Sequence, residues 1–337
     1  MGLNRFYTYN GQILKTAEGN PIGYEFIPPF LLLGTNANIP GNKKTIKFNL
    51  LDLSVDSSLA GNQGPDRHIF SWIYDTSLFI IGDGYTGIAM YSWPMDNNNP
   101  IQIPFSSLGA QIIQGIQPEE GVGIMRSDDG KLLKYSFKDS SINKTSDEKR
   151  LGSNYRDMTM MGSSKFAMST VTRLGIFDVD TLLADVSIAS PQYQGAITSD
   201  GTYLYGCGYW TPHTFITKYN SSLVAEASVN IGEYSTFGNY GLRYNNNTKK
   251  LYYLGQTALF VLNTNLTIDA SVPLSPLDIL QETYSNMIFG KGKIVIGGQN
   301  AASLAKIVIL NEDTLTLDSS IIFGTNTEGQ IFPQQII

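Results

Sequence analysis

Branched apolar, small and polar residues follow one eight-residue pattern at five places along this chain. Each copy has a branched apolar residue at its second and last positions and an acid at its fifth. The copies occupy residues 52–59, 181–188, 222–229, 265–272 and 314–321. Their acids are Asp56, Asp185, Glu226, Asp269 and Asp318. A pattern that returns in this way is the signature of a repeat architecture, in which each repeat is one structural unit.

A second recurring element is a short apolar strand that ends in Asn, Asp or Ser. Its seven copies are centred on residues 48, 91, 135, 177, 219, 262 and 310, so neighbouring copies lie 42 to 48 residues apart. This period matches the four-stranded blades of β-propellers, whereas a β-solenoid has shorter rungs and a β-sandwich does not repeat at this spacing. The sequence therefore predicts an all-β fold, a seven-bladed β-propeller with four strands in each blade.

Every predicted blade has the same strand order. An inner strand is followed by a second strand that usually ends in glycine, and then by the third strand described above. The eight-residue pattern forms the outermost strand in five blades, and the outer strands of the second and third blades are degenerate versions of it. On that strand the repeated acid is expected to face a turn or solvent. Its recurrence favours a structural role, because a catalytic group is needed only once.

Closure of the ring requires one more inner strand, since an open ring leaves an exposed sheet edge. The C-terminal segment 330–337 reads as an inner strand with no blade after it. We expect it to supply the inner strand of the first blade. The alternative is that residues 22–27 do so.

The first 25 residues do not fit the repeat. Segments 5–9 and 12–16, joined by Asn10-Gly11, predict a hairpin, because Asn-Gly supplies the positive φ angles of a type I′ turn. An isolated hairpin is marginally stable in water, so this arm is expected to pack on the body, a second copy or a partner. We divide the chain into a docking arm at 1–25 and a propeller at 26–337. The arm residues proposed for docking are Phe6, Tyr7, Tyr9, Ile13 and Leu14.

Low charge limits the classes of partner. Charged residues make up 15% of the 337 residues, and the formal net charge is −6 at pH 7. An average soluble domain has about 25% charged residues. No stripe of Lys and Arg is present that could neutralise phosphates, so we expect no nucleic-acid partner. Polar character comes instead from Asn, Ser, Thr, Gly and Tyr, as in many extracellular and virion β-proteins.

Cysteine usage and apolar runs add two expectations. The single Cys207 cannot form an internal disulfide, and its apolar strand context predicts a small buried hydrophobic residue. The chain start lacks a charged region followed by an apolar run, and no window approaches the ~18 apolar residues of a spanning helix. We expect neither a secretion signal nor membrane insertion.

Residues 197–205 read Ile-Thr-Ser-Asp-Gly-Thr-Tyr-Leu-Tyr. This segment resembles the Ser-x-Asp-Gly-x-x-Leu-Tyr turn of seven-bladed propellers of the tyrosine-valine-threonine-asparagine class (YVTN, surface-layer and lactonase-like). The resemblance extends over the propeller body as an architecture and a single-blade pattern. The Gly-His and Trp-Asp pairs of the Trp-Asp repeat family and the kelch double glycine are absent.

The whole chain also resembles bacteriophage virion proteins, in its low charge, its Asn/Ser/Thr/Ile-rich β repeats and its short non-repeating arm. Residues 11–20 resemble N-terminal segments of phage fibre and capsid-decoration proteins that dock on the particle. The resemblance implies a virion location as a head or tail appendage, with other virion proteins as partners. It also implies a homo-oligomeric arrangement on the particle and attachment to a host surface glycan or receptor.

Residues suited to catalysis or metal binding are sparse. His68 and His213 lie in different blades, and neither has a second His or Cys at metal-ligand spacing. No nucleophile elbow or phosphate-binding loop occurs. We predict no catalytic residue, no metal and no cofactor. The alternatives are a propeller enzyme of the lactonase or hydrolase type and a cellular scaffold for protein–protein contacts. An enzyme would use groups at the central channel, and the candidates there are Arg67, His68, Glu119, Glu120, Arg156, Arg243 and Glu282.

Aromatic residues in loops are the remaining candidates for binding. They belong to the face that carries the second-to-third-strand and blade-to-blade loops. Tyr and Trp stack on sugars or anchor protein interfaces, and the alternative is that they pack against adjacent blades. The candidates, with one histidine among them, are Tyr85, Tyr193, Trp210, His213, Tyr234, Phe237 and Tyr240. The sequence thus predicts a non-catalytic binding or structural module whose specificity lies in the arm and the uneven loops.

Overall fold

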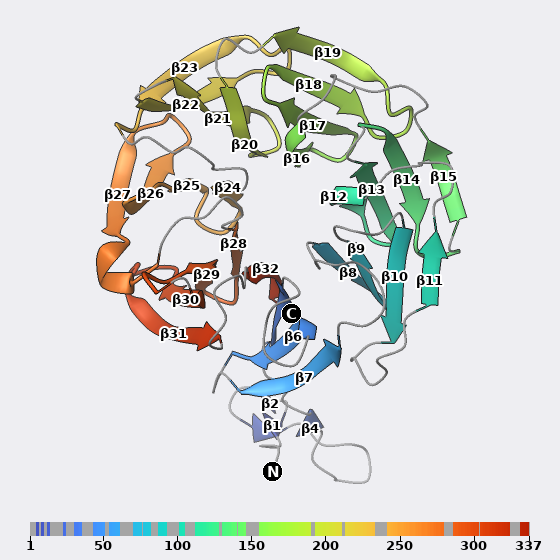
Figure 1. Ribbon diagram of the computed structural model, residues 1–337, viewed down its shortest axis with the longest axis vertical. Coiled ribbons are helices and arrows are strands. Elements are labelled where there is room, and N and C mark those ends of the chain that lie inside the picture. The colour runs from blue at the N-terminus through green and yellow to red at the C-terminus, as the bar shows by residue number, and fades with distance from the viewer. Residues whose placement is uncertain are drawn as a thin grey trace.

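The computed structural model is a ring of β-sheets (Figure 1). The parts of the chain that it describes are residues 5–6, 8–9, 12–13, 23–24, 30–35, 43–50, 54–60, 70–75, 77–81, 87–92, 101–104, 112–127, 130–139, 141–145, 155–189, 193–210, 213–232, 241–279, 286–302, 304–323 and 331–336. Within these residues the strands form seven four-stranded antiparallel sheets and two small two-stranded ones.

Each four-stranded sheet is one blade, with four strand positions from the centre of the ring outward (Figure 1). The inner strands are β8 (Phe70–Tyr74), β12 (Ile112–Glu119), β16 (Tyr155–Met161), β20 (Tyr193–Ser199), β24 (Leu242–Asn245), β28 (Asn286–Gly290) and β32 (Ile331–Ile336). The second strands are β5 (Phe30–Thr35), β9 (Ser77–Ile81), β13 (Val122–Ser127), β17 (Lys165–Thr170), β21 (Leu204–Trp210), β25 (Lys250–Leu254) and β29 (Lys293–Gln299). The third strands are β6 (Lys43–Asn49), β10 (Gly87–Ser92), β14 (Leu132–Ser136), β18 (Arg173–Asp178), β22 (His213–Tyr219), β26 (Ala258–Asn263) and β30 (Ala305–Asn311). The outer strands are β7 (Val55–Ala60), β11 (Ile101–Pro104), β15 (Ser141–Thr145), β19 (Ala184–Ala189), β23 (Ala225–Asn230), β27 (Ile268–Pro273) and β31 (Leu317–Phe323).

The predicted all-β propeller of four-stranded blades is confirmed. One short 3-10 helix, η1 (Ser275–Leu277), interrupts the strands in the described part of the chain.

The two ends of the chain meet in one sheet. The C-terminal strand β32 pairs with β5, and Phe332 lies opposite Gly34. The sheet order is β32-β5-β6-β7, so the last strand of the chain completes the first blade. In the N-terminal region β2 (Thr8–Tyr9) pairs with β3 (Gln12–Ile13) across the two residues Asn10-Gly11. A second short pair joins β1 (Arg5–Phe6) to β4 (Gly23–Tyr24).

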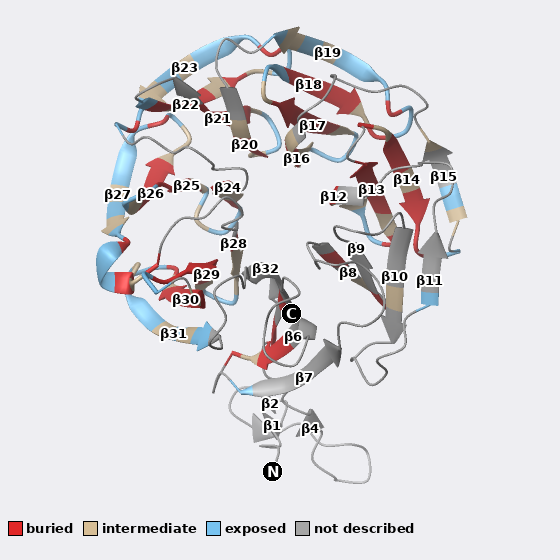
Figure 2. Cartoon of the chain, viewed as in Figure 1, coloured by how far each residue is buried: buried red, intermediate tan, exposed pale blue. Residues whose placement is uncertain are grey.

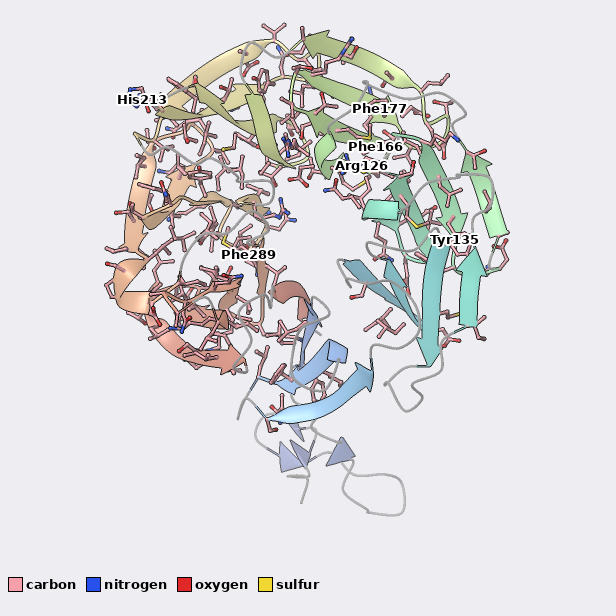
Figure 3. All side chains as sticks on the ribbon, in the orientation of Figure 1. Arg126, Tyr135, Phe166, Phe177, His213 and Phe289 are labelled. Atoms are coloured by element: carbon pink, nitrogen blue, oxygen red, sulfur yellow. The ribbon has the colours of Figure 1, made fainter. Side chains whose placement is uncertain are left out.

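The core lies between blades, among the second and third strands. Figure 2 shows the second and third strands β13, β14, β17 and β18 as mostly buried, whereas the outer strands β19, β23 and β27 are largely exposed. A typical cluster joins Phe166 and Phe177 of one blade to Ile124 and Leu132 of the preceding one. The Phe166 and Phe177 rings are stacked with their centroids 5.3 Å apart (Figure 3). Cys207 is buried in the same kind of contact surface, as expected from its apolar context.

In three blades the polar residue at the end of the third strand, or directly after it, builds the turn that follows. Asp178 Oδ1 accepts hydrogen bonds from the backbone N–H groups of Asp180 and Thr181, at 3.0 and 2.7 Å. Asn220 and Asn311 Oδ1 accept equivalent bonds in their own blades. A short side-chain amide or carboxylate that mimics a backbone turn explains why this position is Asn or Asp in these three blades.

The leucine at the second position of the eight-residue pattern closes that turn in an unusual conformation. It has a positive φ in four blades, at Leu182 (56°), Leu223 (58°), Leu266 (68°) and Leu315 (57°). A left-handed backbone costs a non-glycine residue about 1–2 kcal/mol. Burying a leucine side chain contributes about 1.5–3 kcal/mol, so burial offsets the strain and keeps leucine where glycine would relax the backbone.

The repeated acid has a partner that the pattern did not reveal. Asp185, Asp269 and Asp318 are exposed, as expected. Each also forms an ion pair with a lysine that begins the second strand of its own blade. The pairs are Lys165–Asp185 (2.9 Å), Lys250–Asp269 (2.6 Å) and Lys293–Asp318 (3.0 Å). In the blade of Glu226, Tyr203 precedes the second strand at the equivalent position, and Lys218 lies over the Tyr203 ring at 3.6 Å. The acid therefore links the outer strand to the second strand across the third.

Candidate functional site

A polar cluster joins the inner parts of four consecutive blades, and we call it the inner-strand cluster. It consists of Gln114 on β12, Arg126 on β13, Asp157 on β16, Ser169 on β17 and Arg243 on β24, together with the backbone of β20 at Gly195 and Ile197. Figure 3 shows Arg126 near the inner edge of the ring. Asp157 is the centre of this cluster, and its side chain is 1% exposed.

Each carboxylate oxygen of Asp157 accepts two hydrogen bonds. Oδ1 accepts from Gln114 Nε2 at 2.6 Å and from the backbone N–H of Met158 at 2.9 Å. Oδ2 accepts from the backbone N–H of Ile197 and from Arg243 Nη1, both at 3.0 Å. Three of these donors come from other blades, so a single carboxylate ties four blades together.

Gln114 extends the cluster into the preceding blade. Its Oε1 accepts a hydrogen bond from Arg126 Nη2 at 2.7 Å, while its Nε2 donates to Asp157. This arrangement uses the acceptor end of the amide for the cation and the donor end for the anion, which fixes its orientation. Ser169 connects the other side, because its Oγ donates to Gly195 O at 2.9 Å and accepts from the Asp157 N–H at 3.1 Å.

The electrostatics of Asp157 reflect two opposed effects. Burial raises the pKa of the Asp157 carboxyl above its ordinary value, and the Arg243 guanidinium and the N–H groups of Ile197 and Met158 offset this rise in part. All four partners are donors, so a proton on this carboxyl would have no acceptor among them. The hydrogen-bond geometry therefore matches the ionised form. Arg243 is 21% exposed and is the solvent-facing member of the ion pair.

The cluster is built to hold blades in register. A general base needs a lone pair that can take a proton from a substrate in hydrogen-bond reach. Both oxygens of Asp157 are already occupied by protein donors. A buried carboxylate whose donors come from several strands is the arrangement that fixes a unique packing.

Of the channel candidates from the sequence, the structure brings one into this cluster. Arg243 contacts Asp157 as described. Arg156 is partly exposed on β16, and Glu119 and Glu120 are exposed at the end of β12. The other three, Arg67, His68 and Glu282, lie outside the described residues.

Sequence reasoning missed Gln114, Arg126 and Asp157. The available signal was a polar residue inside an otherwise apolar strand. Arg126 follows Val-Gly-Ile-Met, and Asp157 precedes Met-Thr-Met-Met. That signal identifies buried polar groups but cannot say that they meet, because the partners of Asp157 in the other blades lie 40 to 86 residues away from it.

Three of the loop candidates fall at one end of one blade. The backbone of Trp210 pairs with that of His213, and Tyr193 pairs with Tyr209 on the neighbouring strand. His213 is exposed at the periphery of the ring in Figure 3, and its ring meets Phe215 edge-to-face at 6.4 Å between centroids. The candidates that lie outside the described residues are Tyr85, Tyr234, Phe237 and Tyr240. In the arm, the backbone of Phe6, Tyr9 and Ile13 is described within strands, and Tyr7 and Leu14 lie outside the described residues.

Two general features of the described residues complete the picture. No group of three or more His, Cys, Asp or Glu side chains there is arranged to hold a metal ion. No helix in the described ranges has the length and apolar character needed to cross a membrane.

Comparison with known proteins identifies a fold and no family. Neither a protein-family model nor a curated protein matches the sequence. Among solved structures, the chain is similar to the computationally designed Ika8 protein, with a TM-score of 0.61 and 10% identity over 91% of this chain and 94% of that chain. It is also similar to dihydro-heme d1 dehydrogenase NirN in complex with DHE, with a TM-score of 0.53 and 13% identity over 78% of this chain and 56% of that chain. At such identities the likeness supports the β-propeller fold alone.

Proposed function

We propose that this chain is a non-catalytic structural and binding protein of a bacteriophage virion, a head or tail appendage. One observation carries the non-catalytic part. The buried acid of the inner-strand cluster, Asp157, accepts four protein hydrogen bonds and links four blades. A group committed in this way stabilises a rigid platform, and specificity then belongs to parts that do not repeat.

The virion setting is supported by the character of the chain. Its low charge and its Asn/Ser/Thr/Ile-rich repeats are typical of virion β-proteins, and its arm stands apart from the repeat. Among the described residues of the arm, β2 pairs with β3, and such a hairpin can pack against a partner surface. In this proposal the arm docks on the particle through Phe6, Tyr7, Tyr9, Ile13 and Leu14. The loop face then contacts another virion protein or a host surface glycan.

Co-sedimentation tests the docking role. Purified full-length protein is mixed with particles and centrifuged through a sucrose cushion, and the bound fraction is measured. We expect Phe6→Asp together with Ile13→Asp to abolish binding, because a charge cannot be buried at an apolar contact without a partner. The matched control is Val224→Asp, an exposed apolar residue on the outer strand side of a blade. Equal binding by the arm variant and the control would contradict the docking role.

The second candidate function is a propeller enzyme of the lactonase or hydrolase type. The observation that favours it is the buried Asp157–Arg243 pair, since buried charged pairs with shifted pKa values are enriched at active sites. A panel of lactones and esters, assayed with and without divalent metals, distinguishes the two functions. Turnover that is lost in a folded Asp157→Asn variant would replace our proposal with the enzyme. A cellular scaffold for protein contacts, a third alternative, would show neither turnover nor particle binding.

A further inference from the structure

Two exposed lysines have a backbone conformation that is unfavourable for their residue type. Lys249 and Lys291 have φ angles of 57° and 51°, and they lie in the turns between the inner and second strands of the sixth and seventh blades. This left-handed region is unfavourable for residues other than glycine, and less so for Asn and Asp. The leucines with the same conformation pack into the core, which offsets the strain, whereas both lysine side chains are exposed.

The chemistry of these turns does not explain a lysine at either position. In the third blade the residue directly before the second strand is Gly121, with a φ of 75°, and Lys249 occupies the same position in the sixth blade. In the seventh blade Lys291 and Gly292 form a two-residue hairpin loop, and both have a positive φ. Asn-Gly is the preferred sequence for such a loop. The two lysines are therefore kept for a reason outside the turns themselves.

A buried acid ties the two turns together. Glu312 is 5% exposed and follows the third strand of the seventh blade. Its Oε1 accepts a hydrogen bond from Asn245 Nδ2, and its backbone N–H donates to Gly292 O at 2.9 Å. Asn245 O in turn accepts from the Lys249 N–H at 2.9 Å. Lys249 and Lys291 thus lie on linked turns of neighbouring blades, on the face of the ring opposite the loop face.

The lysines in these two turns differ in their partners. The lysine that follows each turn pairs with the acid of its own outer strand, as described above. Lys249 and Lys291 form no ion pair with an acid in the described part of the chain, and the exposed Asp313 beside Glu312 pairs with neither of them. Both ammonium groups can therefore bind an anion from solution.

We propose that these two turns bind an acidic saccharide through Lys249 and Lys291. The ammonium groups suit its carboxylate or sulfate, and the exposed amides of Asn246 and Asn247 suit its hydroxyl groups. Two lysines on a chain with a net charge of −6 are too few for a nucleic acid. A stable protein interface buries about 800 Å² on each partner, more than two short turns offer. The inference goes beyond the proposed function, because it assigns a ligand class to the face opposite the loop face.

The test uses the full-length protein and oligosaccharides that end in sialic acid, uronic acid, sulfated hexose or neutral hexose, each titrated by calorimetry. We expect the wild-type protein to bind at least one acidic oligosaccharide, and Lys249→Asn and Lys291→Asn each to weaken that binding about tenfold. Lys138→Asn removes the same charge from an exposed position of the third blade and should bind as the wild type does.

Urea unfolding adds a readout that separates binding from a structural role. Asn tolerates the left-handed region better than Lys, and Lys291→Asn places Asn before Gly292, which is the preferred loop sequence. Both variants should therefore raise the urea midpoint slightly or leave it unchanged while they lose binding. A midpoint below that of the wild type in both variants would show that the lysines serve the fold, and would overturn the inference.

Three binding results would also overturn it. They are no binding of any acidic oligosaccharide by the wild-type protein at millimolar concentration, binding that survives both substitutions in one chain, and equal binding of neutral oligosaccharides. Inorganic phosphate and sulfate, titrated alone, distinguish a saccharide from a free anion. If either binds as tightly as the best oligosaccharide, the saccharide assignment is wrong. These titrations use isolated protein, so their outcome is independent of the co-sedimentation test of particle docking.

Discussion

Replacing Asp157 by Asn isolates the role of the inner-strand cluster, because the side chain keeps its shape and loses its charge. An amide offers one oxygen and one NH2 group, whereas all four partners of Asp157 are donors. Whichever way the amide turns, two donors lose their acceptor. Either Gln114 Nε2 and the Met158 N–H or the Ile197 N–H and Arg243 then face a donor.

The expected loss follows from the geometry. Removing one partner of a buried ion pair costs about 3–5 kcal/mol, and each unsatisfied buried donor costs about 1–3 kcal/mol. Two effects make the total cost smaller than the sum of these penalties. Arg243 is 21% exposed, so water can replace the lost carboxylate. The Asn side chain also carries no charge, so no charge at residue 157 has to be desolvated on folding. We therefore expect a loss of about 3 kcal/mol in the free energy of unfolding. That is a large share of a total of about 5–15 kcal/mol.

Equilibrium unfolding in urea at pH 7, followed by tryptophan fluorescence and circular dichroism, measures this loss. The matched control is Asp185→Asn, which removes an exposed ion pair with Lys165 and should change stability by less than about 1 kcal/mol. A double-mutant cycle with Arg243→Met should give a coupling energy above about 1 kcal/mol. If Asp157→Asn destabilises no more than Asp185→Asn, the cluster does not clamp the blades and the reasoning fails.

Three further outcomes follow from the repeat. Leu182→Ala should lower the free energy of unfolding by about 2–5 kcal/mol. Leu182→Gly should be no less stable than the Ala variant, because a φ of 56° favours glycine. If urea unfolding shows the Gly variant to be much less stable than the Ala variant, the backbone at residue 182 is not strained. The Thr181 N–H and hydroxyl lower the pKa of Asp178 below its unfolded value of 3.8. The stability that the ionised Asp178 contributes is therefore fully present above pH 3.8 and is lost as the pH falls through its folded pKa. Asp178→Asn should keep the turn, because Asn220 forms the same turn in the next blade. Between pH 7 and pH 3 the urea midpoint of this variant should therefore fall less than that of the wild type. An equal fall would show that ionisation of Asp178 does not cause the loss of stability. Lys250→Met should lower the melting temperature by only about a degree or two, because Lys250 and its partner Asp269 form a partly exposed ion pair. This shift should shrink in 0.5 M salt, which screens exposed charges. A shift that does not depend on salt would come from lost packing of the lysine side chain instead.

The fold was readable from the sequence because propeller blades repeat their local chemistry. The Asn or Asp that ends a third strand is needed by the turn itself, as Asp178 shows with its two N–H bonds. The leucine two positions into the outer pattern is needed by both the turn and the core. Such requirements recur from blade to blade, with the positive-φ leucine in four of them, and recurrence is visible in one sequence without a structure.

The inner-strand cluster was not readable, because it occurs once and its members come from distant segments. Nothing local to Asp157 indicates that Gln114 and Arg243 converge on it. The ion pairs of the outer acids were missed for a related reason, since Lys165 reaches Asp185 across an intervening strand. Trp210 and His213 were predicted to lie in a loop, but the strand register pairs their backbones at the end of β21 and β22.

Quantitative mass spectrometry of gradient-purified particles tests the central claim, that this propeller is a virion component, most directly. The measurement is the molar ratio of this protein to the major capsid protein through repeated density-gradient steps. Our account predicts a constant ratio that persists through each step and falls when the arm carries Phe6→Asp and Ile13→Asp. A ratio that declines towards zero with purification, while the particles stay intact, would contradict it.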